Sequence, residues 1–236
     1  MTTLRATMSS GSVEVGARTV TRPQVEDWLF AEADLLDGWD YDAWLGLFEP
    51  GARYEIPTTD HRGWSAFESG SFVCDDWDLI QARVKRLKSR KAHAENPHSR
   101  THRIVGNVRL FPDGDSADSL RVTASFIVHR ARDGQFDTYV GRYEHILVPD
   151  DVLTANSAVT SVPTANAANV AVTSAPTAKV AAASGDVPTT DGAVSTSVRA
   201  LDGGLMAGAG GFRFRLRRCI LGHEALGPGA RLSFIL

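Results

Sequence analysis

The chain has few cysteines and none of the common motifs for phosphate binding or nucleophilic hydrolysis. Its 236 residues include two cysteines, Cys74 and Cys219. These two could form one disulfide, but a reducing compartment favours two buried free thiols. No Gly-rich phosphate loop, Walker motif or G-x-S-x-G nucleophile turn is present. The sequence therefore gives no sign of nucleotide binding or of acyl transfer through a serine.

Strong net charge and long hydrophobic runs are also missing. A formal net charge of -3 and a pI near 6.2 give no electrostatic reason to expect nucleic acid or an anionic membrane as a partner. No stretch is apolar enough to span a bilayer, and the first twenty residues lack the apolar core of a secretory signal. We therefore expect a cytoplasmic protein that binds neither nucleic acid nor a membrane.

The stretch from Cys74 to Phe111 carries the clearest local pattern. Asp75 or Asp76 can cap a helix, and a Pro-marked bend at Asn96-Pro97 leads from that helix into an alternating strand. The helical stripe comprises Leu79, Ile80, Arg83, Val84 and Leu87. The strand is expected to bury His102, Ile104, Val108 and Leu110, and to expose Thr101, Arg103, Asn107 and Arg109.

Two further helices are predicted near the amino terminus. The first starts near Thr21, has Pro23 in its first turn and is closed by Gly38. The second starts at Asp40 and stops at Pro50-Gly51, before a short strand over residues 53–57. Residues 1–19 have no persistent period and predict a flexible tail.

The second half of the chain predicts an antiparallel sheet with an insertion. Asp133-Gly134 is a hairpin turn between strands over residues 120–132 and 136–149. Residues 150–208 are rich in Ala, Val, Thr and Ser and contain a repeat, which predicts a disordered insertion between two strands. An added pair of protruding strands is the alternative. The last strand, from Gly211, has an apolar face and a basic one with Arg213, Arg215 and Arg217, and the apolar tail 232–236 should dock on the body or on a neighbouring chain.

Six motifs follow one another along the chain: V-E-D-W-L-F-A-E-A-D-L-L-D-G-W-D-Y-D-A-W-L-G-L-F, A-R-Y-E-I-P, A-R-V-K-R-L, A-H-A-E-N-P-H-S-R-T-H-R, G-N-V-R and R-L-S-F-I-L. Through these motifs, the chain resembles the small, or β, subunits of Rieske-type aromatic-ring-hydroxylating dioxygenases over most of residues 21–149 and 210–236. The motifs A-H-A-E and H-S-R-T-H-R look closest to those of subunits that serve p-cumate or benzoate-type substrates.

The resemblance implies a fold, a set of partners and the absence of a catalytic site in this chain. It implies one α+β domain over residues 20–236, a nuclear-transport-factor-like, cone-shaped barrel whose strongly curved, largely antiparallel sheet has the N-terminal helices packed on it. The partner would be a catalytic large (α) subunit in a hexamer of three large and three small subunits, supplied with electrons by a ferredoxin and a reductase. The Rieske 2Fe-2S cluster and the mononuclear iron would lie in that large subunit, so we expect no catalytic, cofactor-binding or metal-binding residue here.

A second interpretation starts from the same fold. Cone-shaped α+β proteins also include free-standing dehydratases, isomerases and ligand-binding proteins, and fold alone does not choose among them. Such enzymes use an acid/base side chain inside the cone. The residues that would line such a pocket are His102, Tyr139, Tyr143, His145 and Asp34.

Overall fold

The computed structural model of the protein describes residues 11–59, 70–89, 95, 97–151, 153, 211–223 and 232–236. The elements in chain order are β1 Ser12–Val15, β2 Arg18–Thr21, α1 Arg22–Asp37, α2 Tyr41–Leu45, β3 Phe48–Pro57, β4 Ser71–Asp75, α3 Trp77–Leu87, β5 Arg100–Pro112, β6 Leu120–Arg132, β7 Gln135–Pro149 and β8 Phe212–Leu221. No helix in the described ranges is long and apolar enough to cross a membrane.

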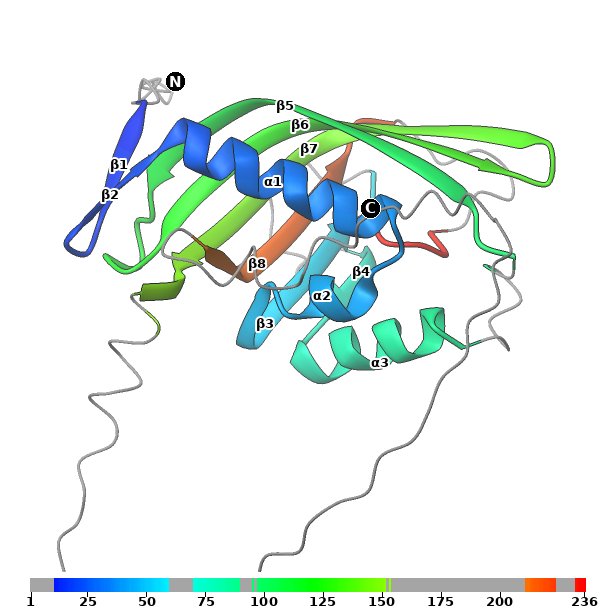
Figure 1. Ribbon diagram of the computed structural model, residues 1–236, viewed down its shortest axis with the longest axis horizontal. Coiled ribbons are helices and arrows are strands. Elements are labelled where there is room, and N and C mark those ends of the chain that lie inside the picture. Colours follow the sequence, from blue (N-terminus) through cyan, green and yellow to red (C-terminus); the bar gives the residue numbers. More distant parts are fainter. Residues whose placement is uncertain are drawn as a thin grey trace, which may run out of the picture.

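One six-stranded sheet organises the fold. Its strand order is β4-β3-β8-β7-β6-β5, and every neighbouring pair is antiparallel except β3 and β8. Helix α1 lies across one face of the sheet, and α2 and α3 lie beside β3 and β4 (Figure 1). We call the face towards α1 the inner face and the opposite one the outer face. The predicted α+β class and largely antiparallel sheet are confirmed, but the described β4 and β5 do not pair, so the closure of the sheet into a cone-shaped barrel stays a prediction.

The predicted starts of the helices follow from their capping residues. Thr21 caps α1 together with Gln24, Pro23 lies in its first turn, and Gly38 ends it, as expected. The side chain of Asp40 accepts a hydrogen bond from Ala43 N at 3.1 Å and starts α2. This second helix ends at Leu45 rather than at Pro50, because the chain enters β3 at Phe48.

The prediction of a flexible tail over residues 1–19 is wrong for residues 12–19. Strands β1 and β2 pair there as a hairpin, in which Ser12 lies opposite Thr21. The hairpin is held by apolar burial, since Val13, Val15 and Val20 are buried. The short alternating runs were too brief to give a persistent period. Residues 1–10 lie outside the described residues.

A β-bulge in β5 reverses the predicted orientation of half of that strand. The register with β6 shifts between Gly106 and Arg109, and Asn107 has a positive φ of 54°. One extra residue in a strand moves the side chains that precede it to the other face. His102 and Ile104 therefore lie on the outer face, and Arg103 is buried, whereas Val108 and Leu110 are buried as predicted.

A second register shift changes the pattern of β8. Phe214 pairs with Leu147, and Leu216 pairs with Ile146, so Arg215 has no residue opposite it. Phe212 and Phe214 are buried as expected, but beyond the shift Arg217 and Cys219 point inward. The expected basic row is thus divided. Its members pair within the chain: Arg213 with Asp150, Arg215 with Glu49 and Arg217 with Glu32.

The two flanks of the predicted insertion meet at one point of the fold. Pro149 pairs with Phe212 at the ends of β7 and β8, and Asp150 N donates to Gly211 O at 3.1 Å. Arg213 Nε lies 2.9 Å from Asp150 Oδ1. The insertion therefore leaves and re-enters the fold at the end of a closed antiparallel ladder. Residues 152 and 154–210 lie outside the described residues, so their predicted disorder stays a prediction.

We expect that replacing residues 154–209 by a short Gly-containing turn leaves the fold intact, because the flanking residues already meet and a shorter loop costs less closure entropy. The measurement is the melting temperature of the shortened protein, compared with a control in which a Gly/Ser-rich segment of equal length replaces the same residues. Insoluble protein, or a melting temperature lower by more than about 5 °C, would contradict the prediction.

Candidate functional site

A buried ion pair lies between α1 and the inner face of the sheet. Arg217 Nε on β8 donates to Glu32 Oε1 on α1 at 2.7 Å, and both side chains are almost fully buried. Trp44 Nε1 on α2 donates to the same carboxylate oxygen at 3.0 Å. Three elements from distant parts of the sequence thus converge on one carboxylate. Such convergence fixes the orientation of α1 over the sheet.

Aromatic rings surround the Arg217 guanidinium. Its central carbon lies 5.6, 5.1 and 5.4 Å from the ring centres of Trp44, Tyr54 and Tyr143. Burial alone would lower the pKa of Arg217, but the neighbouring Cys219 and Glu32 raise it well above its usual value. Arg217 is therefore a permanent buried cation held by one carboxylate and several π faces.

The carboxy-terminal residues of the chain occupy space beside this cluster. Ile235 and Leu236 are fully buried, and Phe234 packs edge-on against Tyr139 at 5.3 Å between ring centres. Leu236 N donates to the hydroxyl oxygen of Tyr54 at 3.3 Å, and Cys219 Sγ lies 3.6 Å from Leu236 O. Burial raises the pKa of Cys219 to about 11, so this thiol stays protonated. The tail docks on the body of its own chain, which is one of the two alternatives that the sequence left open, the other being a neighbouring chain.

Charged side chains hold the tail in place. Arg103 donates to Ile235 O and pairs with Asp37. Ser233 donates to Glu95, which also accepts from Arg130 at 2.8 Å. Burial alone would raise the pKa of Glu95, but the hydrogen bonds from Ser233 and Ser99 and the charge of Arg130 lower it below its usual value. The inner side of the fold is thus closed by segments that are far apart in the sequence.

The five residues predicted for an enzymatic pocket do not come together. Tyr139, Tyr143 and His145 share the inner face of β7, as expected, and Tyr143 stacks on His145 at 4.9 Å between ring centres. The prediction that His102 is buried is wrong: its side chain is 76% exposed on the outer face, because the β5 bulge reverses its orientation. Asp34 is exposed on α1. Neither supplies an acid or base to the inner residues.

His145 is neutral and only half satisfied. Its Nδ1 accepts a hydrogen bond from Arg218 N at 3.3 Å, which places the proton on Nε2, and Nε2 is buried without a partner in the described structure. Burial and the neighbouring Arg217 lower the pKa of His145 well below 6.5. A neutral imidazole of this kind is a core residue, which stacks on Tyr143 and meets Phe214 edge-on.

The described cysteines and histidines do not fit an iron site. A Rieske cluster needs two thiolates and two imidazoles that converge on one point. Cys219 points to the inner side, whereas Cys74 lies on the edge strand β4 beside Glu55, whose side chain is directed to Arg53 and Arg218 on the outer side. Within the described ranges, no group of three His, Cys, Asp or Glu side chains is placed to hold a metal ion.

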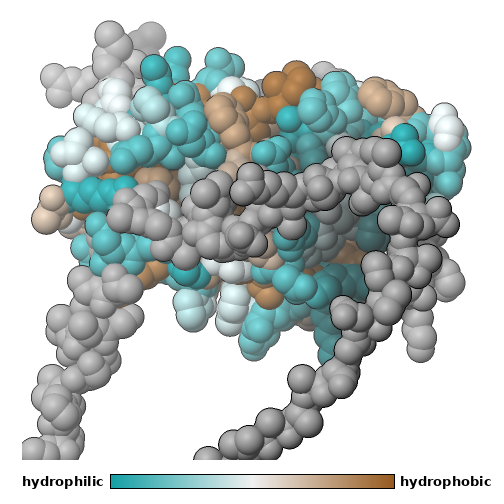
Figure 2. Space-filling model, viewed as in Figure 1, coloured by the Kyte–Doolittle hydropathy of each residue, from teal (hydrophilic) through white to brown (hydrophobic). Residues whose placement is uncertain are grey.

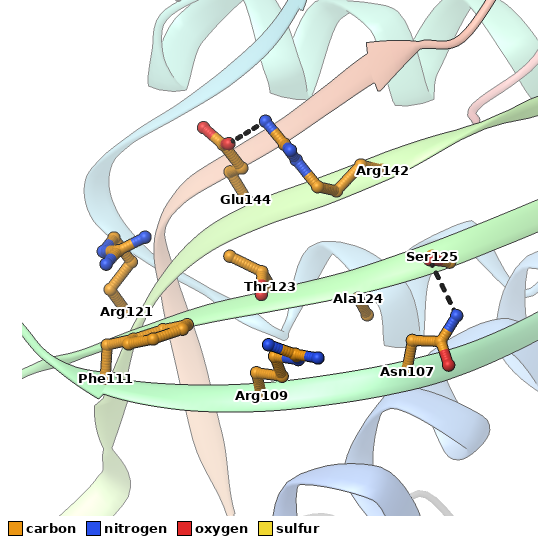
Figure 3. A pocket seen from close by; sticks show the side chains of 9 residues that line it. All are labelled: Asn107, Arg109, Phe111, Arg121, Thr123, Ala124, Ser125, Arg142 and Glu144. Carbon is orange, nitrogen blue, oxygen red and sulfur yellow. Dashed lines mark hydrogen bonds and ion pairs between the residues drawn. The ribbon is translucent and has the colours of Figure 1, made fainter. Parts of the chain in front are cut away.

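The outer face carries a hollow that sequence reasoning did not identify. It has a volume of about 560 Å³ and is formed by β5, β6 and β7 (Figure 3). We call it the outer pocket. Its polar lining consists of Asn107, Arg109, Arg121, Thr123, Ser125, Arg142 and Glu144. Arg142 pairs with Glu144 at 2.6 Å, and Asn107 Nδ2 donates to Ser125 Oγ at 3.2 Å. Sequence reasoning missed this pocket because it did not predict the β5 bulge, which places Asn107 and Arg109 beside β6.

An exposed aliphatic row lies next to the outer pocket. Ile104 on β5 pairs with Ile127 on β6, and Ile127 pairs with Val140 on β7. Their exposed fractions are 50%, 37% and 37%. We call these three residues the aliphatic row. On the opposite side of the molecule, around α1, hydrophilic side chains alternate with small hydrophobic areas (Figure 2).

Comparison with known sequences assigns a family model and a relative. The model for the ring hydroxylating beta subunit matches residues 31–153. The small oxygenase component of the p-cumate 2,3-dioxygenase system of Pseudomonas putida is 41% identical over 126 residues, which cover 53% of this chain and 69% of that protein.

Solved structures show the same fold at low sequence identity. A naphthalene 1,2-dioxygenase structure with bound indole aligns with a TM-score of 0.57 and 16% identity, over 91% of this chain and 85% of that one. The beta subunit of benzoate 1,2-dioxygenase from Burkholderia mallei aligns with a TM-score of 0.53 and 16% identity, over 92% of this chain and 99% of that one. At these identities the likeness concerns the fold.

We predict that Arg217→Leu destabilises the protein by about 3–5 kcal/mol, because it leaves the Glu32 carboxylate buried without its cation. The double variant Glu32→Leu/Arg217→Leu should lose less than the sum of the two single variants, since it strands no charge. Urea unfolding of the four proteins measures the coupling. A loss below about 1 kcal/mol for Arg217→Leu would contradict a structural role of the pair.

A pH dependence follows from His145. Its pKa is lower in the folded protein than the ordinary 6.5, so the unfolded chain takes up a proton first as the pH falls. The stability that depends on neutral His145 is therefore complete above about pH 6.5 and declines below it. We expect the melting temperature to fall more steeply between pH 7 and pH 5 in the wild type than in His145→Asn, which keeps an acceptor for Arg218 N. Parallel curves would contradict this assignment.

Proposed function

The chain belongs to the ring-hydroxylating beta subunit family and is the small subunit of a ring-hydroxylating dioxygenase, and on that premise we propose that its role is mainly structural. In this proposal the subunit holds a catalytic large subunit in an assembly of three large and three small subunits. The Rieske 2Fe-2S cluster and the mononuclear iron lie in the large subunit. A ferredoxin and a reductase deliver electrons to it, and the complex cis-dihydroxylates an aromatic compound.

One observation carries the structural role. The inner side of the sheet, where the enzymes of the alternative interpretation would bind substrate, holds the Arg217–Glu32 pair and the chain's own Ile235 and Leu236. The hydroxyl oxygen of Tyr54 accepts a hydrogen bond from Leu236 N and so helps to hold the tail there. Cys219 links the ion pair to the tail, since Arg217 Nη1 donates to its Sγ at 3.1 Å and this Sγ lies 3.6 Å from Leu236 O. These contacts support a packed core at this position. The alternative of a free-standing dehydratase, isomerase or ligand-binding protein finds no such support.

The substrate class follows from the relative rather than from this chain. The 41% identity is to a component of a system named for p-cumate, an aromatic carboxylate. We propose an alkyl-substituted or unsubstituted benzoate as the substrate of the complex. Recognition of that substrate would belong to the large subunit.

The proposal predicts different properties for the isolated chain and for the complex. Purified alone, the chain should bind no stoichiometric iron and should convert no aromatic carboxylate. Co-expressed with its large subunit, it should elute as a hexamer, and the complex should consume one O₂ per dihydrodiol when ferredoxin, reductase and NADH are added. Iron content, light scattering and oxygen uptake measure the three quantities.

Two results would overturn the proposal. One is a Rieske absorption band or aromatic turnover by the isolated chain. The other is a large subunit that assembles and reaches full turnover per iron without this chain. A stable complex with no turnover on benzoates would overturn only the substrate class.

A further inference from the structure

The charges that line the outer pocket are not balanced. Three arginines, Arg109, Arg121 and Arg142, face a single carboxylate, that of Glu144 (Figure 3). Arg142 Nη2 lies 2.6 Å from Glu144 Oε1, so these two side chains neutralise each other. The second oxygen of Glu144 lies 3.9 Å from Arg218 Nη1. No negative charge of the lining is therefore left to offset Arg109 and Arg121.

These two arginines have no ion-pair partner among the residues that the structure describes. Arg121 lies over the ring of Phe111, with 4.4 Å between its central carbon and the ring centre. A planar guanidinium that stacks on a ring keeps its N–H groups directed outward in its own plane, where they can bind an acceptor. The ring thus orients Arg121 without using its hydrogen-bonding capacity.

The register of the sheet brings the two arginines together. Arg109 on β5 pairs with Thr123 on β6, and Phe111 pairs with Arg121, so Arg109 and Arg121 are diagonal neighbours. Diagonal neighbours on one face have Cβ atoms about 7–8 Å apart, which long side chains can bridge. Both side chains are exposed on the outer face. They can therefore hold one ligand between them.

The rest of the lining supplies hydrogen-bond donors rather than an apolar wall. Asn107 Nδ2 donates to Ser125 Oγ at 3.2 Å, which leaves the hydroxyl hydrogen of Ser125 free to donate to a ligand. Thr123 adds a second hydroxyl. The aliphatic row does not line the pocket, because Ile127 lies one outward row beyond Ser125 on β6. This lining disfavours a ligand with a large apolar body.

Charge and size narrow the class of ligand further. Two unpaired guanidinium groups are balanced by two negative charges, and arginine forms paired, charge-assisted hydrogen bonds with both phosphate and carboxylate oxygens. The volume of about 560 Å³ lies in the range of small-molecule sites. It holds a phosphate group or a short dicarboxylate together with a polar body.

We propose that the outer pocket is a binding site for an oxygen-rich dianion, a phosphate group or a dicarboxylate, held between Arg109 and Arg121. The site belongs to this chain alone and does not depend on the proposed function, which leaves recognition of the aromatic carboxylate to the large subunit. An aromatic monocarboxylate balances only one of the two charges and finds no apolar wall here. It should therefore bind more weakly than a dianion.

Calorimetric titration of the purified full chain tests the ligand class. At about pH 8 inorganic phosphate is mostly a dianion. Phosphate or succinate should bind with a dissociation constant of about 1 mM or less, and benzoate should bind at least about tenfold more weakly. Comparing phosphate with succinate distinguishes the two sources of the dianion. Benzoate that binds as tightly as both of them would overturn the proposal.

Two pairs of variants test the residues. Arg109→Gln/Arg121→Gln should weaken binding of the dianion by about tenfold or more, because it removes charge-assisted hydrogen bonds. Arg109→Lys/Arg121→Lys keeps both charges but loses the paired geometry, so it should lose less than the Gln variant. Both variants should melt within about 3 °C of the wild type, because the replaced side chains reach solvent.

The matched control is Lys85→Gln/Arg86→Gln, which removes two positive charges from the exposed side of α3. It should keep the affinity of the wild type. An equal loss in this control would show that the dianion responds only to the overall charge of the chain, and would overturn the site. Unchanged binding by Arg109→Gln/Arg121→Gln, or no saturable binding of phosphate and succinate by the wild type, would also overturn it. None of these results bears on the proposed function, because the large subunit takes no part in the measurements.

Discussion

The buried pair of Arg217 and Glu32 is the constraint on which the packing of this subunit depends. Two charges in a core are costly, and they are tolerated here because Trp44 donates to the same carboxylate and aromatic rings face the guanidinium. The pair joins α1 to β8, the strand that completes the sheet. Arg217 also donates to Cys219 Sγ at 3.1 Å, and Cys219 contacts Leu236 in the tail. The position of Arg217 therefore also affects how the tail packs. A shift of this side chain would loosen the helix, the sheet and the tail together.

Local signals predicted the elements well, and long-range register was the part they could not supply. Thr21 and Gly38 delimit α1, and Asp133-Gly134 forms the β6–β7 turn, because capping and turn chemistry act within a few residues. The orientation of His102 was predicted wrongly because alternation was counted through Asn107 as if the strand were continuous. Asparagine tolerates the positive φ that the bulge requires, but it occurs in regular strands as well, so it gave no decisive sign.

In the site, too, features set by neighbouring residues were predictable, whereas contacts between distant parts of the sequence were not. Tyr139, Tyr143 and His145 were placed on one face correctly, since β7 runs without a shift through those positions. Glu32 is one of several charged residues within α1, and its neighbours in the sequence gave no sign of a partner. Its partner is 185 residues away in the sequence, behind a register shift in β8. Pairing over that separation depends on the complete topology, which no local pattern contains.

The position of β8 between β3 and β7 has a consequence for how the protein forms during synthesis. β8 is a central strand, yet it is the last strand in the described ranges, and it follows the long Ala/Thr/Val-rich segment. Until it arrives, β3 and β7 each present an unpaired edge, and such edges invite pairing with other chains. The native pairing of Arg53 with Leu216 also joins residues that are far apart in the sequence, and such long-range pairings slow folding. The nascent subunit therefore passes through an interval of aggregation risk whose duration increases with the length of the inserted segment.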